Sequence, residues 1–520
     1  MWLVVILSCA AVFAGLLLGS RPLARLVERR ANAALQRAYD GQLEVKHLQV
    51  SLFPHVLVNL QGISLHRDDP GGVLLITINK AVGATGYWDL LRRPLHIRRM
   101  TVDQLEIHVP PRKQDGSAHP TESHSKRLPR FVIDELVANG TKLEILPKDA
   151  GKLPLEFDIH DLTLTGVSLD APMKFRAILT NAKPAGDIHS TGTFGPWQLD
   201  DPAETPVQGT YTFRNADLSV FKGIAGTLSS EGKYQGVLDH INVQGQTDTP
   251  DFTVKVSGNP VHLVTQFQAV VDGMNGDTRL DPVDGQFGHS SLVARGLVHG
   301  TRGEHGKTTD LDVEVSQGRL EDMLRLGVKG SQPSMTGAIS FHTKLEIPPG
   351  PVEIPEKLIL DGQFAAEQTR FAQLNIQERV DKLSARGRGD AGAPDDPVVA
   401  SNFQGRFTLK DGVMNFQQLS FQVPGVQVGL DGNYGLLDEK LDLHGTAQLK
   451  AKLSQTVTGF KSFLLKPLDP FFRKGGVNTS LRFHIGGTRS HPTFGLDLGD
   501  SHKSGDSHKD PATAKVAGGN

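Results

Sequence analysis

Two short motifs in this sequence contain the residue types used for nucleotide binding and nucleophilic catalysis. Gly387–Gly392, GRGDAG, matches the G-x-G-x-x-G pattern, in which a helix that begins at the glycines holds a pyrophosphate. Residues 393–397 read APDDP, which we do not expect to open a helix. Ser123 and Lys126 match the S-x-x-K pattern of a serine beside its base, but they lie in a polar run with no periodic element around them. The first motif therefore does not predict a nucleotide-binding site, and the second does not predict a catalytic serine.

Acidic pairs and histidines offer the remaining chemistry. Asp68-Asp69 and Asp395-Asp396 stand in predicted turns, where carboxylates are solvated caps and not an acid–base pair. The 20 histidines are scattered, and a repeated D-S-H-K pattern places His502 and His508 in a low-complexity tail. Weak metal binding is one interpretation of this tail, and a solvated linker is the one we favour. No G-x-S-x-G, H-E-x-x-H or EF-hand pattern occurs. We expect no enzyme activity, catalytic residue, metal site or cofactor.

Composition argues against further classes. In 520 residues, Lys and Arg number 55 and Asp and Glu number 57, so no overall positive charge favours nucleic acid as a partner. Aromatic residues make up 6% of the chain, which leaves little surface for base stacking. The one cysteine, Cys9, lies in an N-terminal apolar run, so no internal disulfide is possible. This cysteine usage fits a bacterial periplasm or a cytosol.

The N-terminus carries a membrane signal. Residues 2–19 contain no charge and are close to the length that spans a hydrocarbon core. A cleaved signal peptide is the alternative, but the run is long and no A-x-A pattern follows it. We predict an uncleaved single-pass anchor, for which the sequence provides the apolar residues Trp2, Leu3, Val4, Val5, Ile6, Leu7, Val12, Phe13, Leu16, Leu17 and Leu18.

Arginines after this anchor, at positions 21, 25, 29, 30 and 37, bear on its orientation. The positive-inside rule would place the following body in the cytoplasm, whereas long domains can be exported despite flanking charge. The flanking residues therefore do not decide the side of the membrane.

Most of the remaining chain alternates apolar and polar residues with the period of two that is typical of strands. About 25 candidate strands, spaced about 8–15 residues apart, predict a mostly β protein. Residues 425–449 show the pattern clearly, and Asp431-Gly432-Asn433 predicts the turn of a hairpin. The residues expected on the apolar face are Val426, Val428, Leu430, Leu441, Leu443, Ala447 and Leu449. The residues expected on the polar face are Gln427, Asp431, Asp442, His444, Thr446 and Gln448.

Few helices interrupt the predicted strands. The patterns indicate helices over 22–39, 216–224, 320–326, 372–384 and 453–472. Residues 346–357 and 389–398 are predicted connectors, because they are rich in proline or in glycine and aspartate. Residues 112–127 and the tail after residue 498 are predicted to lack regular structure.

Several of these segments resemble the AsmA-like family of bacterial envelope proteins, which includes the TamB relatives. The resemblance begins with the anchor and GQLEVKHLQVSLFPHVLVNLQGISL at 41–65, and continues with YWDLLRRPLHIRRMTVDQLEIHVPPR at 87–112. Further similar segments are 223–252, 370–389 and 403–449, together with FLLKPLDPFFRKGG and the closing FHIGGTRSHPTFGLDL. The similarity is spread over about residues 1–498, and its most distinctive property is the order of the segments.

The resemblance implies an elongated, twisted β-sheet groove built from many short strands behind one N-terminal transmembrane helix. It implies an inner-membrane protein with its body in the periplasm, a placement with which the flanking arginines disagree. The implied units are an anchor (1–20), an N-terminal AsmA-like or chorein-like domain (21–111), a polar loop (112–130), central groove repeats (131–388), a linker (389–400), a C-terminal AsmA-like domain (401–498) and a disordered tail (499–520). The implied function is phospholipid transport between the inner and outer membranes, or support of outer-membrane assembly and homeostasis, with outer-membrane or other envelope proteins as possible partners.

The predicted helix 453–472 is amphipathic. Leu453, Val457, Phe460 and Leu464 fall on one face, and Phe463 adds aromatic bulk beside nearby basic residues. Such a segment can lie in a lipid interface or can cap the open end of a sheet. Both interpretations remain open at the level of sequence.

The central hypothesis is that Val426, Val428, Leu430, Leu441, Leu443 and Leu449 line a groove that binds phospholipid acyl chains. Period-two strands supply a continuous apolar surface, and each buried methylene contributes about 0.8 kcal/mol. A closed sandwich core is the alternative use of the same side chains. An adaptor whose β-rod binds envelope proteins by edge-strand addition is the alternative function. An all-β glycan hydrolase would need clustered carboxylates that the sequence does not display.

Overall fold

The computed structural model describes residues 43–51, 55–66, 74–89, 95–110, 131–146, 154–168, 170–198, 201–301, 306–330, 332–388, 398–449, 480–489 and 491–496. The predicted anchor 2–19, the predicted helices 22–39 and 453–472, the S-x-x-K pair, both acidic pairs and the tail lie outside these residues. Among the described residues, no helix has the length and apolar content needed to cross a membrane.

Over the residues that the structure describes, the alternating pattern forms one sheet of 24 strands, so the mostly β prediction is confirmed. The first half of the sheet contains β1 Leu43–Ser51, β2 Val56–His66, β3 Leu74–Thr85, β4 Leu95–Val109, β5 Phe131–Ile145, β6 Leu155–Val167, β7 Met173–Ala182, β8 Ala185–Phe194, β9 Pro206–Asp217, β10 Ile224–Ala225, β11 Thr227–Val237 and β12 His240–Val254. The second half contains β13 Pro260–Val271, β14 Thr278–Phe287, β15 Ser290–Gly300, β16 Lys307–Arg319, β17 Met335–Ile347, β18 Ile359–Phe371, β19 Ser401–Lys410, β20 Val413–Val423, β21 Val426–Gly435, β22 Leu441–Leu449, β23 Ser480–Gly487 and β24 Pro492–Leu496.

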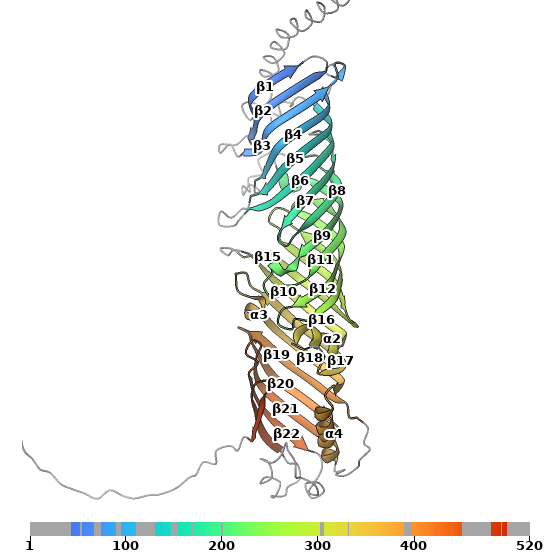
Figure 1. Ribbon diagram of the computed structural model, residues 1–520, viewed down its shortest axis with the longest axis vertical. Helices are drawn as coiled ribbons and strands as arrows, with labels where there is room; N and C mark the ends of the chain where they lie inside the picture. Colours follow the sequence, from blue (N-terminus) through green and yellow to red (C-terminus); the bar gives the residue numbers. More distant parts are fainter. Residues whose placement is uncertain are drawn as a thin grey trace, which may run out of the picture.

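Consecutive strands pair along the whole sheet, almost always antiparallel. The pair β4–β5 is parallel, and β9 pairs with β11 while the two-residue β10 extends the edge beside β12. The result is a long rod in which the chain advances from one end to the other (Figure 1). Pairing continues across the predicted polar loop, through β4–β5, and across the predicted linker, through β18–β19.

The sheet curls into a half-barrel, and β-bulges contribute to that curl. Register shifts occur between nearly every pair of neighbours from β12 to β21. Gln368 and Gln418 lie at two of these shifts and have positive φ angles of 51° and 56°. Each bulge bends its strand and increases the local right-handed twist, so a row of bulges rolls a flat sheet into a trough.

The helices among the described residues lie at strand connections. They are η2 Pro202–Glu204, η3 Leu218–Val220, α2 Leu320–Gly327, α3 Ile354–Lys357 and α4 Leu374–Arg388. The predicted helices at 320–326 and 372–384 are confirmed. The predicted helix at 216–224 is wrong, because β9 continues to Asp217 and only one 3-10 turn follows before β10. The Asp217 carboxylate accepts a hydrogen bond from the Ser219 N–H (2.8 Å), and this cap starts a single turn.

The strand ends form two long rims of the sheet, which we call its edges. Turns from the two edges contact each other midway along the rod, and we call this line of contact the seam. The Ile354 N–H at the start of α3 donates to the Lys222 carbonyl, which follows β9 (3.0 Å). Near β6, a methyl group added at Gly276 in the β13–β14 turn would lie 3.5 Å from Leu155 Cδ1. Because successive turns of an antiparallel sheet alternate between its two edges, both contacts join one edge to the other.

The hairpin predicted at Asp431-Gly432-Asn433 is wrong in its position. All three residues lie inside β21, and the chain reverses after Gly435, whose N–H donates to the Lys440 carbonyl (3.0 Å). Gly432 pairs with Leu443 and has a φ angle of 138°, and a side chain there would collide with the Asp442 carbonyl. The glycine therefore permits a close strand approach and not a turn.

Gly432→Ala should lower the free energy of unfolding by about 1–3 kcal/mol, because alanine is strained at this φ and collides with β22. Gly429→Ala is the matched control in the same strand, since nothing lies within 4 Å of an added methyl group there. Urea unfolding followed by circular dichroism measures both variants. Equal effects at the two positions would contradict this role of Gly432.

Candidate functional site: the apolar face of the sheet

The strand register joins the apolar residues of successive strands into one face, which we call the apolar face. Near the N-terminal end, Ile76 of β3 lies opposite Ile107 of β4, which lies opposite Leu143 of β5. Near the C-terminal end, Phe421 of β20 lies opposite Val428 of β21, and Val428 lies opposite Ala447 of β22. Because side chains alternate along every strand, matched registers keep each apolar set on the same side throughout.

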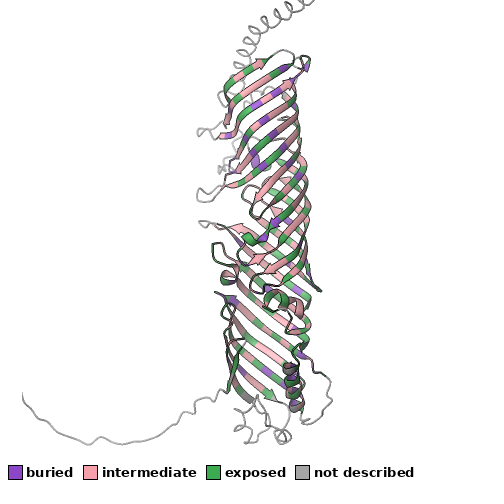
Figure 2. Ribbon diagram, in the orientation of Figure 1, coloured by how far each residue is buried: buried purple, intermediate pink, exposed green. Residues whose placement is uncertain are grey.

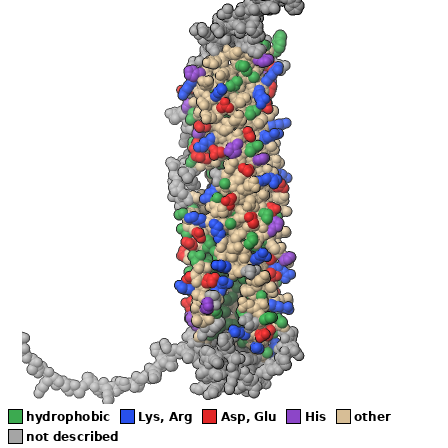
Figure 3. Space-filling view, viewed as in Figure 1, with side chains coloured by type: hydrophobic (Ala, Val, Ile, Leu, Met, Phe, Trp, Pro, Cys, Tyr) green, Lys and Arg blue, Asp and Glu red, His purple; other side chains and the backbone are tan. Residues whose placement is uncertain are grey.

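The two faces differ in exposure. In β12, Ile241 and Val243 are half-buried, whereas His240, Asn242 and Gln244 are exposed. This alternation of buried or half-buried and exposed positions recurs along the rod (Figure 2). Side chains on the concave side of a curled sheet lie closer together than those on the convex side, and the apolar residues are the less exposed set, so we assign the apolar face to the concave side. Figure 3 shows a hollow in the lower part of the rod with hydrophobic side chains inside it.

Glycine and aromatic residues alternate in reciprocal pairs on the apolar face. Gly209 and Tyr211 of β9 lie opposite Tyr234 and Gly232 of β11, so each ring faces a glycine on the other strand. A methyl group at Gly232 would lie 2.9 Å from the Tyr211 ring. Each ring therefore lies close against backbone, where a side chain would otherwise stand.

The same arrangement recurs between β18 and β19. Gly362 and Phe364 lie opposite Phe407 and Gly405, and the two phenylalanine rings are 6.2 Å apart between centroids. Aromatic rings that cover cross-strand glycines stabilise sheets and keep their surface even. In the sequence, this feature is indicated by the repeated Gly-x-aromatic pattern. The alternation of apolar and polar residues does not indicate it.

Two tyrosines of the apolar face have their hydroxyl groups satisfied within the face. Tyr211 Oη lies 3.1 Å from Ser230 Oγ, and Tyr234 Oη lies 2.7 Å from Ser190 Oγ. Burial raises the pKa of Tyr211 and of Tyr234 above the ordinary value, and the serine hydrogen bonds oppose part of that shift. These polar groups are paired with each other, and the face presents mainly ring and methyl surface.

Five of the six predicted lining residues lie on the apolar face, but their surroundings differ. Leu430, Leu441 and Leu443 are half-buried on the apolar side of β21 and β22. Val426 and Val428 are only 2% and 7% exposed. Leu449 pairs with Val426 at the end of β22. The predicted polar residues Gln427, Asp442 and His444 are exposed on the opposite side.

Helix α4 accounts for the burial of Val426 and Val428. Val380 and Leu383 of this helix pack in a cluster with both valines. The helix ends against the β20–β21 turn, where a methyl group at Gly387 would collide with Val426 and Gly425. Gly387, the first glycine of the G-x-G-x-x-G match, thus ends a helix and allows close packing, so it does not open a phosphate-binding helix.

The seam brings three lysines together. Lys357 of α3 lies near Lys183 and Lys222 from the opposite edge, and its Nζ donates to the Gly350 carbonyl (3.0 Å). Burial lowers the pKa of Lys357, and the two positive neighbours lower it further. This is a concentration of positive charge at the place where the two edges of the sheet touch.

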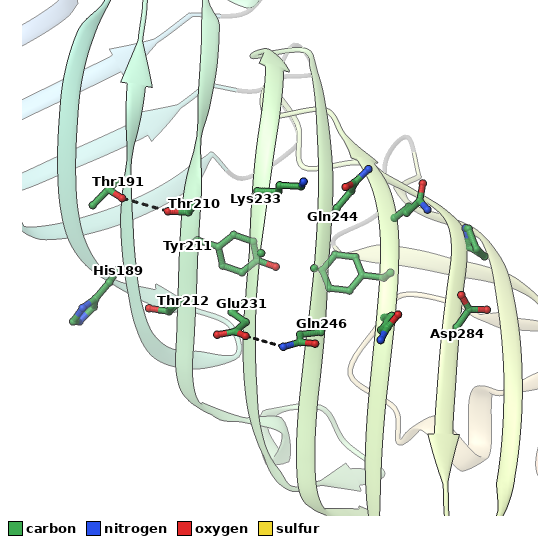
Figure 4. A pocket seen from close by; sticks show the side chains of 16 residues that line it. His189, Thr191, Thr210, Tyr211, Thr212, Glu231, Lys233, Gln244, Gln246 and Asp284 are labelled. Atoms are coloured by element: carbon green, nitrogen blue, oxygen red, sulfur yellow. Dashed lines mark hydrogen bonds between the residues drawn. The ribbon is translucent and has the colours of Figure 1, made fainter.

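A shallow depression of about 880 Å³ lies over β8–β14, lined mainly by the polar side of these strands (Figure 4). Two pairs of its polar side chains are hydrogen-bonded to each other, Gln246 Nε2 to Glu231 Oε1 (2.7 Å) and Thr191 Oγ1 to Thr210 Oγ1 (3.3 Å). The groups stand in parallel rows and do not converge on one point. We therefore take the apolar face, and not this depression, as the candidate site.

The predicted anchor residues, from Trp2 to Leu18, and the predicted interfacial residues Leu453, Val457, Phe460, Phe463 and Leu464 lie outside the described residues. Their membrane roles remain predictions. Comparison of the chain with models of protein families, with curated proteins and with solved structures finds no match.

The raised tyrosine pKa values predict an alkaline loss of stability. Above about pH 10, tyrosines ionise in the unfolded chain while Tyr211 and Tyr234 still hold their protons, so the free energy of unfolding falls as pH rises. The double variant Tyr211→Phe/Tyr234→Phe should show a smaller fall between pH 9 and pH 11, measured by urea unfolding. Tyr87→Phe, at an exposed position, is the control. An unchanged pH slope in the double variant would show that these rings are not in a desolvated face.

Proposed function

We propose that this chain is a non-enzymatic lipid-carrying protein of the bacterial envelope, of the AsmA-like type that its sequence resembles. In this proposal the apolar face holds phospholipid acyl chains, and the polar headgroups remain in water along the open side of the trough. The N-terminal segment anchors the protein in the inner membrane with its body in the periplasm.

One observation carries the proposal: a single curled sheet in which the apolar rows continue from strand to strand along its length. A catalytic site needs convergent polar groups. An acyl chain that slides needs only a contiguous apolar surface, in which no position binds it much more tightly than the next. At about 0.8 kcal/mol per buried methylene, a chain that slides along such a face exchanges equal contacts at each step. The glycine–aromatic pairs support the proposal, since they favour an even surface without deep side pockets.

The seam and α4 suggest how the trough is divided. At the seam, the edges of the sheet touch and could enclose acyl chains, while near β21 helix α4 covers Val426 and Val428. Leu441 and Leu443 lie farther along the same face and are left to serve as lining. The lysines at the seam would attract phosphate groups of lipids that pass it.

An adaptor role is the second candidate, in which the rod binds envelope proteins by strand addition. Its support is the same long sheet, whose terminal strands β1 and β24 could each extend by pairing with a partner. This role makes no use of a continuous apolar interior.

Native mass spectrometry of the full chain, extracted in mild detergent, separates the two candidates. We expect phospholipid masses retained on the protein after the detergent is removed. An adaptor would carry partner peptides and no lipid, and that result would overturn the lipid proposal. Protease accessibility in spheroplasts would show on which side of the membrane the body lies.

Leu443→Asp should lower the amount of bound phospholipid about tenfold, which equals about 1.4 kcal/mol or two methylenes of lost contact. Gln448→Asp adds the same charge to the exposed side of the same strand and should leave lipid retention unchanged. Quantitative lipid extraction measures both variants, and circular dichroism checks their folding. Loss of all structure in Leu443→Asp would instead favour a closed core, where the carboxylate could not reach water.

A further inference from the structure

Three side chains with metal-ligating atoms converge on the polar face near the C-terminal end of the sheet. They are Asp442 and His444 of β22 and His484 of β23, which we call the Asp–His–His cluster. Asp442 and His444 are two residues apart and so share a face, and the register places His484 directly opposite His444. All three side chains are solvent-accessible, with 65%, 52% and 40% exposed.

Both imidazoles approach the same carboxylate oxygen. His484 Nε2 lies 2.9 Å from Asp442 Oδ1, and His444 Nε2 lies 3.5 Å from that oxygen. The two rings lie nearly side by side, with centroids 4.8 Å apart and planes inclined at 34°. One oxygen and two nitrogens therefore face a common point from two adjacent strands.

We propose that this cluster binds a divalent transition-metal ion such as Zn²⁺. In a tetrahedral zinc site with ligand distances of about 2.0–2.1 Å, neighbouring ligand atoms lie about 3.3 Å apart. The two nitrogen–oxygen separations, 2.9 and 3.5 Å, bracket this value. Two imidazoles and one carboxylate make a donor set that suits Zn²⁺, and solvent exposure leaves the remaining positions to water.

Local charge supports a cation here. Asp431 of β21 lies opposite His444 and adds a second carboxylate to the same side of the sheet. Two cations lie two residues away along the strands: Arg482, opposite Thr446, and Lys440, whose Nζ is paired with Asp438 (3.0 Å). A divalent ion would thus be held by two neutral imidazoles beside two negative groups, which favours binding at neutral pH.

This cluster differs from other histidine–aspartate pairs of the sheet in the number of its ligating groups. His262 with Asp248 (2.7 Å), His299 with Asp310 (2.9 Å) and His342 with Asp312 (2.8 Å) are pairs of two ligating groups. Within the described part of the chain, a third ligating group joins such a pair only at the Asp–His–His cluster. The two-member pairs therefore serve as internal controls.

A bound ion would tie β23 to β22. Residues 450–479 separate these strands in sequence, and their register covers Leu443 to Gln448. An ion held from both strands would fix that register, because it binds only when His444 and His484 lie opposite each other. This inference does not depend on whether the apolar face carries lipid.

Isothermal titration of the full, untagged chain with ZnCl₂ after EDTA treatment and dialysis tests the proposal. We expect about one ion per chain with a dissociation constant on the order of 10 μM or tighter. His444→Asn and His484→Asn should each weaken binding about tenfold or more, whereas His342→Asn should not change it. Titration with Co²⁺ should give the visible absorption of a nitrogen- and oxygen-bound ion in the wild type and lose it in His484→Asn.

The histidines of the tail provide the competing site. His502→Asn/His508→Asn should leave zinc binding intact, and binding that disappears in this variant would overturn the proposal. Binding that is unchanged in His444→Asn/His484→Asn, or absent from the wild type, would also overturn it. Circular dichroism of each variant confirms that the fold is retained, since the three side chains are exposed.

Discussion

Alternation of side chains along paired strands is the constraint on which this structure depends. In the described part of the chain, one sheet supplies both the apolar and the polar surface, and no second sheet covers the apolar side. Apolar surface left flat in water would cost free energy roughly in proportion to its area. Curling the sheet brings the apolar side chains towards one another, as in the cluster formed by Ile63, Val102 and Leu162. In the second half of the sheet, the bulges that bend the strands add to this curl and help to convert an exposed layer into a trough.

Cross-strand pairing determines where aromatic residues can lie in the trough without protruding from its surface. Tyr211 and Tyr234 each lie opposite a glycine, so the rings take the space that two side chains would otherwise occupy. Helix α4 obeys the same principle at another place, since the absence of a Cβ at Gly387 lets the helix end rest on Gly425. At these positions glycine serves to admit close neighbours. In contrast to a sandwich, where a second layer fills such gaps, the gaps here are filled from within the same layer.

Sequence reasoning predicted the faces of the strands more successfully than the connections between them. The period of two was enough to place Leu443 on the apolar side and His444 on the polar side, because alternation is local. The Asp431-Gly432-Asn433 turn was wrong, since the same residues suit a close strand approach, and only the partner strand distinguishes the two uses. The covering of Val426 by α4 and the meeting of His444 with His484 depend on contacts between distant segments. Such contacts are set by strand registers, which a pattern along one strand does not reveal.

The seam has a consequence for how the molecule resists unfolding. A sheet in which each strand touches only its two neighbours resembles a linear array, and such arrays can open from either end strand by strand. The contact of Lys222 with Ile354 ties β9 to the β17–β18 connection, far along that array. Strands between these points cannot separate one at a time without breaking the tie. The middle of the rod should therefore open as one cooperative unit, with slower amide exchange than the two ends.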